Sequence, residues 1–209
     1  MIAALSQGTL QRLPQYLIML KPEQRSGRTA VTAEEIGAVV QVSPSQVRHD
    51  LTACGADGAE AWEIGLLIQT IEHALGYDDV ASAVIVGAGQ LGRALLSYQN
   101  YADYGVEVLA AFDANEDMAG QEVAGKPILS VKRMSGLCRR MKVHIGIITV
   151  PAAFAQEACD ALLEGGVQAI WNFAPVHLKV PEGVIVKNEI IAVSLGELSR
   201  QLQEKRRND

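Results

Sequence analysis

Three glycines at fixed spacing and one aspartate are the residues of this 209-residue chain whose types most clearly suggest a chemistry. Gly87, Gly89 and Gly92 follow the apolar run Ala83–Val86, and Asp113 closes the next apolar run. Between a strand and a helix, such glycines allow a tight turn, close approach of backbone to a pyrophosphate, and close helix packing. An acid after the second strand accepts hydrogen bonds from a ribose. The spacing predicts a nucleotide-binding Rossmann unit; the alternative is a glycine-rich turn that binds no ligand.

Later strands of the predicted Rossmann domain would bring further residues to the same edge of the sheet. The continuous apolar run Val143–Val150 predicts a strand buried on both faces. Its end at Thr149–Pro151 would face a ligand, because ligands bind outside the carboxyl ends of strands in open α/β sheets. A helix over about 152–164, between Pro151 and Gly165-Gly166, is expected to follow. A further strand at 169–173 carries Asn172, whose amide would either bind a ligand or cap a loop.

The N-terminal third predicts three short helices. Leu13, Leu17 and Leu20 belong to the first, with Pro14 in its first turn and a polar loop over 21–30. A capping box of Thr32 and Glu35 begins the second helix. The third begins at Ser43-Pro44, where Gln46 would reach back to the cap, and ends near Ala53. Only a few residues separate the second helix from the third, which is helix-turn-helix spacing.

The outer face of the third helix could contact DNA. Gln46 and Arg48 suit bidentate hydrogen bonds to base edges, and Ser45 and His49 could contact phosphates. The alternative is a three-helix domain used only for packing or dimerisation.

Charge argues against a generally basic nucleic-acid-binding surface. The chain has a net charge of −6 and a pI of about 5.3. Residues 11–54 carry five basic and four acidic side chains, a net charge of +1, and residues 55–79 carry six acids and no Lys or Arg. Because DNA affinity depends heavily on phosphate neutralisation, this distribution weakens the expectation of DNA binding.

The other sequence features suggest a reduced, cytoplasmic protein without a catalytic apparatus. Three scattered cysteines favour free thiols over disulfides or a zinc site, and neither a signal peptide nor a membrane span is expected. No Ser-His-Asp, HExxH or paired-carboxylate pattern accompanies the four histidines, so neither an enzyme nor a metal site is predicted. An apolar stripe on a C-terminal helix, Ile191, Leu195, Leu198 and Leu202, must be buried on its own domain or on a partner subunit.

The chain resembles the Rex family of redox-sensing transcriptional repressors over almost its whole length. The motifs that carry the resemblance are Arg12–Leu17, Gln46–Leu51, Gly87–Tyr98, Ala111–Asp113, Ile147–Ala152, Asn172–Pro175 and Val180–Val184. The resemblance implies a homodimer that binds double-stranded operator DNA through winged-helix domains, binds NAD(H) in Rossmann domains, and exchanges its C-terminal helices. In that family NADH favours a closed dimer that releases DNA, while NAD⁺ permits operator binding. Asp113 favours NAD(H) over NADP(H), because it would repel a 2′-phosphate.

The residues expected to act fall into three groups. The cofactor-binding candidates are Gly87, Ala88, Gly89, Gln90, Leu91, Gly92, Arg93, Asp113, Thr149, Val150, Pro151, Asn172, Phe173, Ala174 and Pro175. The DNA-binding candidates are Arg12, Ser45, Gln46, Arg48 and His49. The dimer and switch candidates are Tyr98, Glu189, Ile191, Leu195, Leu198 and Leu202.

Three departures from the family pattern bear on DNA binding and on the switch. The segment 52–62, expected to form the wing, is acidic and has no arginine, and His49 stands where the family usually has lysine. Ile190 stands where family members often carry an aspartate that pairs across the dimer with the residue matched by Tyr98 or Arg93. Either Glu189 substitutes for that aspartate or the contact is absent.

The predicted architecture is α/β with three parts. A winged helix-turn-helix domain occupies 1–79, a doubly wound parallel Rossmann domain 80–188, and a swapped C-terminal helix 189–209. The leading hypothesis is a redox-sensing repressor released from DNA by NADH. A Rex-like paralogue that has lost DNA binding and a small NAD- or CoA-binding enzyme are the alternatives.

Overall fold

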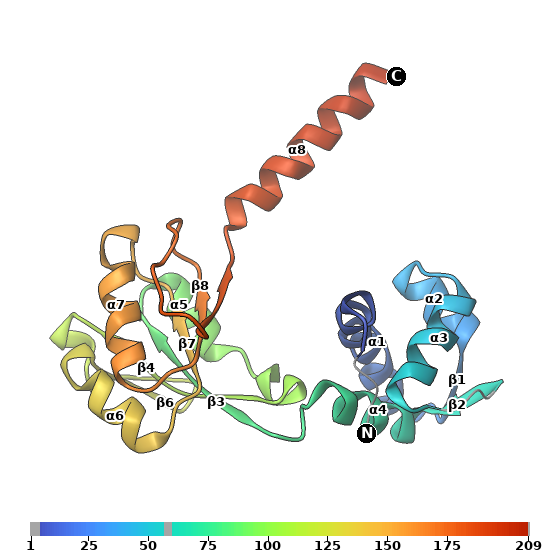
Figure 1. Cartoon of the computed structure of the whole chain (residues 1–209), viewed down its shortest axis with the longest axis horizontal. Helices are drawn as coiled ribbons and strands as arrows, with labels where there is room; N and C mark the ends of the chain where they lie inside the picture. The colour runs from blue at the N-terminus through green and yellow to red at the C-terminus, as the bar shows by residue number, and fades with distance from the viewer. Residues whose placement is uncertain (1–4, 57–59, 209) are drawn as a thin grey trace. The chain divides into compact units, whose positions relative to one another are not determined.

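The computed structural model describes residues 5–56 and 60–208, and the chain divides into two compact units, Met1–Asp79 and Val80–Asp209 (Figure 1). Unit 1 contains α1 (Gln7–Arg25), β1 (Ala30–Thr32), α2 (Ala33–Val40), α3 (Pro44–Cys54), β2 (Ala61–Glu63) and α4 (Ile64–Leu75). Strands β1 and β2 pair antiparallel, with Val31 opposite Trp62. The two strands therefore flank the helix-turn-helix of α2 and α3, one before it and one after it.

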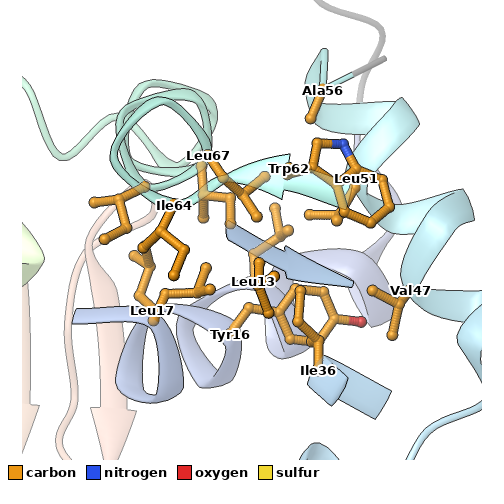
Figure 2. Close-up of a cluster of buried hydrophobic side chains, with 14 of the residues drawn as sticks. Leu13, Tyr16, Leu17, Ile36, Val47, Leu51, Ala56, Trp62, Ile64 and Leu67 are labelled. Carbon is orange, nitrogen blue, oxygen red and sulfur yellow. The ribbon is translucent and has the colours of Figure 1, made fainter. Parts of the chain in front are cut away.

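One apolar core holds the helices of unit 1 together. Leu13 and Leu17 of α1, Val47 and Leu51 of α3 and Trp62 of β2 are all at most 7% exposed and belong to one cluster (Figure 2). Their spacing puts them on the inner faces of the helices, so hydrophobic burial fixes α3 against α1.

The start signals of α2 and α3 are confirmed, with one difference. Thr32 and Glu35 form a reciprocal capping box, and the Ser43 hydroxyl accepts a hydrogen bond from the Gln46 N–H. The Gln46 side chain does not reach back to the cap but turns to Asp50 in the next turn. Gly37 allows the sharp connection, because a Cβ there would lie 2.5 Å from the Val42 carbonyl oxygen.

The expected boundaries of the first helix were wrong. Ser6 caps α1, which continues to Arg25 with Pro14 and Pro22 inside it, so Pro14 is not in the first turn and 21–25 is helix rather than loop. Each proline removes one helical hydrogen bond. Burial of Leu13, Tyr16, Leu17 and Leu20 on one continuous face outweighs that loss.

Unit 2 is built on a seven-stranded sheet in the order β5-β6-β4-β3-β7-β8-β9. Its strands are β3 (Ala81–Val86), β4 (Val106–Asp113), β5 (Glu122–Val123), β6 (Lys126–Ser130), β7 (Ile145–Ile148), β8 (Ala169–Asn172) and β9 (Ile185–Asn188). All neighbours pair parallel except β5 with β6. From β6 to β9 this is the 3-2-1-4-5-6 order of a Rossmann fold, with the topological switch between β3 and β7.

Helices cover both faces of this sheet. The helices of unit 2 are α5 (Gln90–Ser97), α6 (Met134–Met141), α7 (Ala152–Glu164) and α8 (Ile191–Asn208). Val84 and Val86 of β3 pack with residues of α6 and α7, whereas Ala83 and Ile85 pack with Leu96 of α5. The alternation along β3 therefore gives the predicted doubly wound α/β arrangement.

Several boundaries differ from those expected. Helix α7 has the predicted bounds, but α6 was not anticipated and β7 is half as long as the apolar run suggested. Val143 is buried just before β7, and Thr149 leaves the strand to support the neighbouring turn. Because apolar residues also precede and follow β7 along the chain, the sequence pattern predicted a longer strand than the backbone hydrogen bonds form.

The C-terminal helix α8 presents its apolar stripe to solvent in the single chain. Ile191, Leu195 and Leu198 are each more than 60% exposed, and Leu202 is 48% exposed. No helix in the described part of the chain combines the length and hydrophobicity needed to cross a bilayer.

Candidate functional site

The turn between β3 and α5 is shaped by its glycines. Gly87 has φ +100°, a conformation that side chains rarely adopt, and its N–H donates to the Phe112 carbonyl oxygen at 2.7 Å. A Cβ on Gly92 would lie 1.8 Å from the Gly87 carbonyl oxygen, so α5 can start close to the strand only with glycine there. A Cβ on Gly89 would meet nothing within 4 Å, which leaves this backbone open to a ligand.

The amino end of α5 is free of side-chain caps. Gly89 is the N-cap and makes no side-chain capping bond, and the first turn contains no acidic residue. Unpaired N–H groups and the positive end of the helix dipole therefore point out of the turn. Phosphate oxygens satisfy both, so the geometry suits the pyrophosphate predicted from Gly87, Gly89 and Gly92.

Asp113 joins the end of β4 to this turn. Its Oδ2 accepts a hydrogen bond from the Ala88 N–H at 2.6 Å, and its Oδ1 accepts one from the Asn115 N–H at 2.8 Å. Each carboxylate oxygen keeps capacity for a further donor, such as a ribose hydroxyl. The Ala88 N–H, by contrast, is already committed to Asp113 and is not free to bind a phosphate.

A cavity of about 620 Å³ opens beside the turn, within the size range of ligand sites. Of the residues expected to bind a cofactor, it is lined by Gly87, Gly89, Asp113, Thr149, Val150 and Pro151. Ala88, Gln90, Leu91, Gly92, Arg93 and the segment 172–175 are not in its lining. The cavity thus joins the ends of β3, β4 and β7, as expected for a ligand at the switch point.

Sequence reasoning missed the far wall of the cavity. Val131, Lys132, Met134, Phe154 and Glu157 also line it. Phe154 and Glu157 lie three residues apart on α7, directly after the predicted strand end at Pro151. The position of α7 after a strand end was the available signal that its first turns would reach a ligand site.

Two predicted ligand contacts have structural roles here. The Thr149 hydroxyl lies 2.8 Å from the Gly87 carbonyl oxygen and 3.0 Å from that of Val86, to which it donates. Asn172 is fully buried, and its Nδ2 lies within hydrogen-bond distance of the Ala174 and Val176 carbonyl oxygens and of Asn188 Oδ1. Because these acceptors use both amide hydrogens, the geometry favours the alternative in which Asn172 orders the loop.

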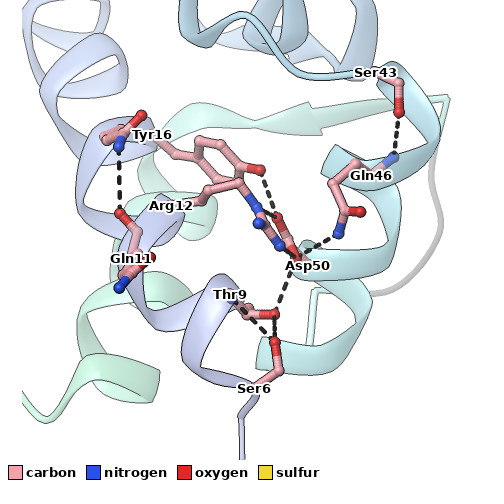
Figure 3. Close-up of polar contacts among 9 residues, drawn as sticks. Ser6, Thr9, Gln11, Arg12, Tyr16, Ser43, Gln46 and Asp50 are labelled. Atoms are coloured by element: carbon pink, nitrogen blue, oxygen red, sulfur yellow. Dashed lines mark hydrogen bonds and ion pairs between the residues drawn. The ribbon is translucent and has the colours of Figure 1, made fainter.

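On the helix-turn-helix, two of the DNA-binding candidates, Arg12 and Gln46, hydrogen-bond to a buried carboxylate (Figure 3). Asp50 of α3 is fully buried and accepts hydrogen bonds from Arg12 Nε at 2.6 Å and Nη2 at 2.8 Å. The Tyr16 hydroxyl donates at 2.7 Å, and Thr9 and Gln46 each donate at 3.0 Å. The carboxylate therefore joins α1 to α3 and restricts both Arg12 and Gln46.

Electrostatics hold this cluster in one ionisation state. Burial opposes ionisation of Asp50, but hydrogen bonds from Arg12, Tyr16, Gln46 and Thr9 outweigh it and lower its pKa to about 2. The bond to Asp50 raises the pKa of Arg12, and burial raises that of Tyr16. Arg12 is thus a permanently charged group whose planar face is fixed by a bidentate pair.

The remaining candidates of α3 are exposed. Ser45 and His49 are at the surface, and Arg48 Nη2 lies 2.6 Å from Glu34 Oε1 on α2. The pKa of Glu34 is lowered by its hydrogen bond with Arg48. Both partners are largely exposed, so the pair is weak and phosphates could displace it. Of the acidic wing, residues 57–59 lie outside the described residues.

The dimer and switch candidates all lie at least partly at the surface of the single chain. Tyr98 is 45% exposed and packs edge-on against Tyr101, with ring centroids 4.9 Å apart. Glu189 is half-buried, and its N–H donates to the Asn172 carbonyl oxygen. Their contacts across a dimer stay predictions, as does the assignment of 189–209 as a dimerisation segment.

Comparison with known proteins covers both units. A family model described as a putative DNA-binding protein N-terminus matches residues 4–52, and one described as a CoA binding domain matches residues 78–176. The redox-sensing transcriptional repressor Rex of Treponema denticola is 33% identical over 95% of this chain and 95% of its own length. That of Clostridium beijerinckii is 35% identical over 96% of each.

Solved structures match over the same extent. A crystal structure of RSP, a Rex-family repressor, in complex with β-NAD⁺ and operator DNA has a TM-score of 0.86 and 30% identity, covering 98% of this chain and 95% of that one. A second crystal structure of RSP, in complex with β-NADH, has a TM-score of 0.84 and 29% identity, covering 98% and 97%. The similarity therefore includes the helix-turn-helix, the Rossmann sheet and the residues that follow it.

Proposed function

The chain belongs to the Rex family of redox-sensing transcriptional repressors, and we propose that it binds operator DNA as a homodimer and is released from it by NADH. The observation that carries this proposal is the match over 98% of the chain to a repressor seen with NAD⁺ and operator DNA and with NADH. Its relatives are transcription regulators and not enzymes. A cytoplasmic location is part of the proposal, because operator DNA and the nicotinamide pool are there.

In this proposal NAD(H) binds along the carboxyl ends of β3, β4 and β7. The open backbone at Gly89 and the uncapped start of α5 support a role in holding the pyrophosphate. Asp113 would accept hydrogen bonds from the adenosine ribose while keeping the turn closed through Ala88. The same carboxylate would repel a 2′-phosphate, so NAD(H) is favoured over NADP(H).

The cofactor would act as a signal, since bound NAD(H) supplies a ring that is cationic when oxidised and neutral when reduced. A neutral ring enters an apolar interface at lower cost than a cation. A ligand shifts a conformational equilibrium only toward the state with which it interacts better. NADH must therefore interact better with the state of the dimer that does not bind DNA. The exposed stripe of α8, with Leu195 and Leu198 at its centre, would be buried on the partner subunit.

DNA contact is assigned to the outer face of α3. Ser45, Arg48 and His49 are exposed along it, and Arg12 and Gln46 both hydrogen-bond to Asp50 of the same helix. A dimer would read two half-sites about one helical turn or a multiple apart, which requires recognition helices about 34 Å or a multiple apart.

The test is fluorescence anisotropy of the full-length protein with labelled DNA from its gene's own upstream region. NAD⁺ should leave a saturable complex intact, and NADH should raise its Kd. Arg48→Ala should weaken the complex, while Arg140→Ala removes an exposed charge from α6 and should not. The proposal would be refuted if the protein formed no sequence-specific complex at low salt, either with or without NAD⁺.

One observation favours a second candidate, an NAD(H)-binding relative that has lost DNA recognition. Residues 55–79 carry six acids and no Lys or Arg, and Arg12 and Arg48 are each paired with a carboxylate. In that case NADH would bind but no DNA complex would form. Replacing Glu60 by Arg and His49 by Lys should then restore measurable DNA affinity.

A further inference from the structure

Apart from the glycine turn and Asp113, the lining of the cavity is mostly apolar, and Val131, Met134 and Ala158 belong to this part of it. Along a dinucleotide the adenine follows the ribose, which in turn follows the pyrophosphate. If the turn holds the pyrophosphate and Asp113 holds the adenosine ribose, the attached base must lie against this remaining lining.

An exposed aromatic residue belongs to this part of the lining. Phe154 lies in the first turn of α7, lines the cavity and is 57% exposed. More than half of its surface is left uncovered by the residues that the structure describes. A flat base laid against Phe154 would remove that apolar surface from water and add a stacking contact.

The next residue on the same helical face is acidic. Glu157 lies three residues after Phe154, so the two side chains emerge from one side of α7, and both line the cavity. Within the residues described, the Glu157 carboxylate has no hydrogen bond or ion pair, whereas Lys132 of the cavity wall is 2.9 Å from Glu116. Glu157 thus brings unused acceptors to the edge of a base stacked on Phe154.

We propose that Phe154 and Glu157 select a purine that carries an amino group at C6. Phe154 stacks on the base, and the Glu157 carboxylate accepts a hydrogen bond from the exocyclic N–H. A base with an oxygen at C6 offers no hydrogen there and places a lone pair against the carboxylate. The inference rests on the proposed binding of NAD(H) and adds the chemical feature by which this chain recognises the adenine end.

The experiment compares NADH with deamino-NADH, which carries hypoxanthine in place of adenine. Both are titrated into the full-length protein and followed by nicotinamide fluorescence and calorimetry. The wild-type protein should bind NADH about tenfold more tightly, the value of one charge-assisted hydrogen bond at a partly exposed site. Glu157→Gln should bring the ratio of the two affinities close to one, because an amide can accept a hydrogen bond from an amino group or donate one to an oxygen.

Two further variants separate base selection from other effects. Glu164→Gln makes the same charge change on α7 at a residue outside the cavity lining, and should leave the ratio unchanged. Phe154→Leu should weaken both nucleotides by about three- to tenfold, because it removes stacking that every base enjoys. In Phe154→Leu the ratio of the affinities for NADH and deamino-NADH should stay near that of the wild-type protein.

The outcomes are separable. Equal binding of both nucleotides by the wild-type protein, or an unchanged ratio in Glu157→Gln, would overturn the assignment while leaving NAD(H) binding in place. If Glu157→Gln and Glu164→Gln shifted both affinities by the same factor, the effect would be general charge and the assignment would also fall. If neither nucleotide bound, the proposed function would fail, and this inference with it.

Discussion

Replacing Asp50 should reveal how much the carboxylate between α1 and α3 stabilises unit 1. Asp50→Ala would leave the donors of Thr9, Arg12, Tyr16 and Gln46 without their acceptor. Each unsatisfied buried donor costs about 1–3 kcal/mol, and breaking a buried ion pair costs about 3–5 kcal/mol in all. Water can reach part of Arg12, which is 25% exposed, so we expect a loss of about 3–4 kcal/mol at pH 7.

The same residue predicts a pH dependence with a definite sign. The pKa of Asp50 falls from 3.8 to about 2 on folding, which corresponds to about 2 kcal/mol of stability. Because the folded pKa is the lower one, this stability is fully present above about pH 4. This stability is lost as the pH falls toward 2, because Asp50 then becomes protonated in the folded protein as well as in the unfolded one. The difference in free energy of unfolding between the wild-type protein and Asp50→Asn should therefore narrow by about 2 kcal/mol as the pH falls from 5 to 2.

Urea unfolding followed by tryptophan fluorescence can isolate unit 1. The chain has two tryptophans, Trp62 in the core of unit 1 and Trp171 in β8 of unit 2, so Trp171→Phe leaves one reporter. The matched control is Asp78→Asn, which removes a carboxylate that pairs with His73 at the surface and should cost less than about 1 kcal/mol. The reasoning would be refuted if Asp50→Ala lost no more stability than this control. It would also be refuted if the difference in stability between the wild-type protein and Asp50→Asn stayed constant with pH.

Three further changes have equally definite outcomes. Gly92→Ala should weaken NADH binding by about 100-fold in a fluorescence titration, because its Cβ would collide with the Gly87 carbonyl oxygen; unchanged affinity would contradict the tight-turn assignment. Glu34→Gln should raise DNA affinity about three- to tenfold by releasing Arg48, and anisotropy showing no gain would mean that the pair does not limit binding. Leu198→Glu should convert the proposed dimer to monomer in light scattering, since it places a charge in the exposed apolar stripe of α8; a persistent dimer would locate the interface elsewhere.

The features predicted well from sequence are those encoded over short distances. The turn at Gly87–Gly92 and the capping box of Thr32 and Glu35 follow from residues a few positions apart, and the structure contains both. Helix α7 was bounded in advance by Pro151 and a pair of glycines. Such signals are local steric and hydrogen-bonding rules, so they survive whatever surrounds them.

The features missed depend on residues that meet only after folding. Asp50 contacts Arg12 and Tyr16 across 38 and 34 positions, and no periodicity along α3 indicates that its carboxylate is buried. The far wall of the cavity needed the placement of α6 and α7 on one face of the sheet. Asn172 shows the same limit, because only the folded loop shows that its amide hydrogens are already used.

The charge pairs on the helix-turn-helix determine what kind of DNA binding this chain can achieve. Arg12, Arg28 and Arg48 all form ion pairs with carboxylates of unit 1. A phosphate that binds one of these side chains displaces or shares a protein carboxylate, so the net counterion release per contact is reduced. Affinity gained without large phosphate neutralisation must come from base contacts, which the fixed positions of Arg12 and Gln46 around Asp50 would favour. The same pairing lowers non-specific binding more than specific binding, so an acidic repressor whose helix-turn-helix arginines are paired with carboxylates can remain selective.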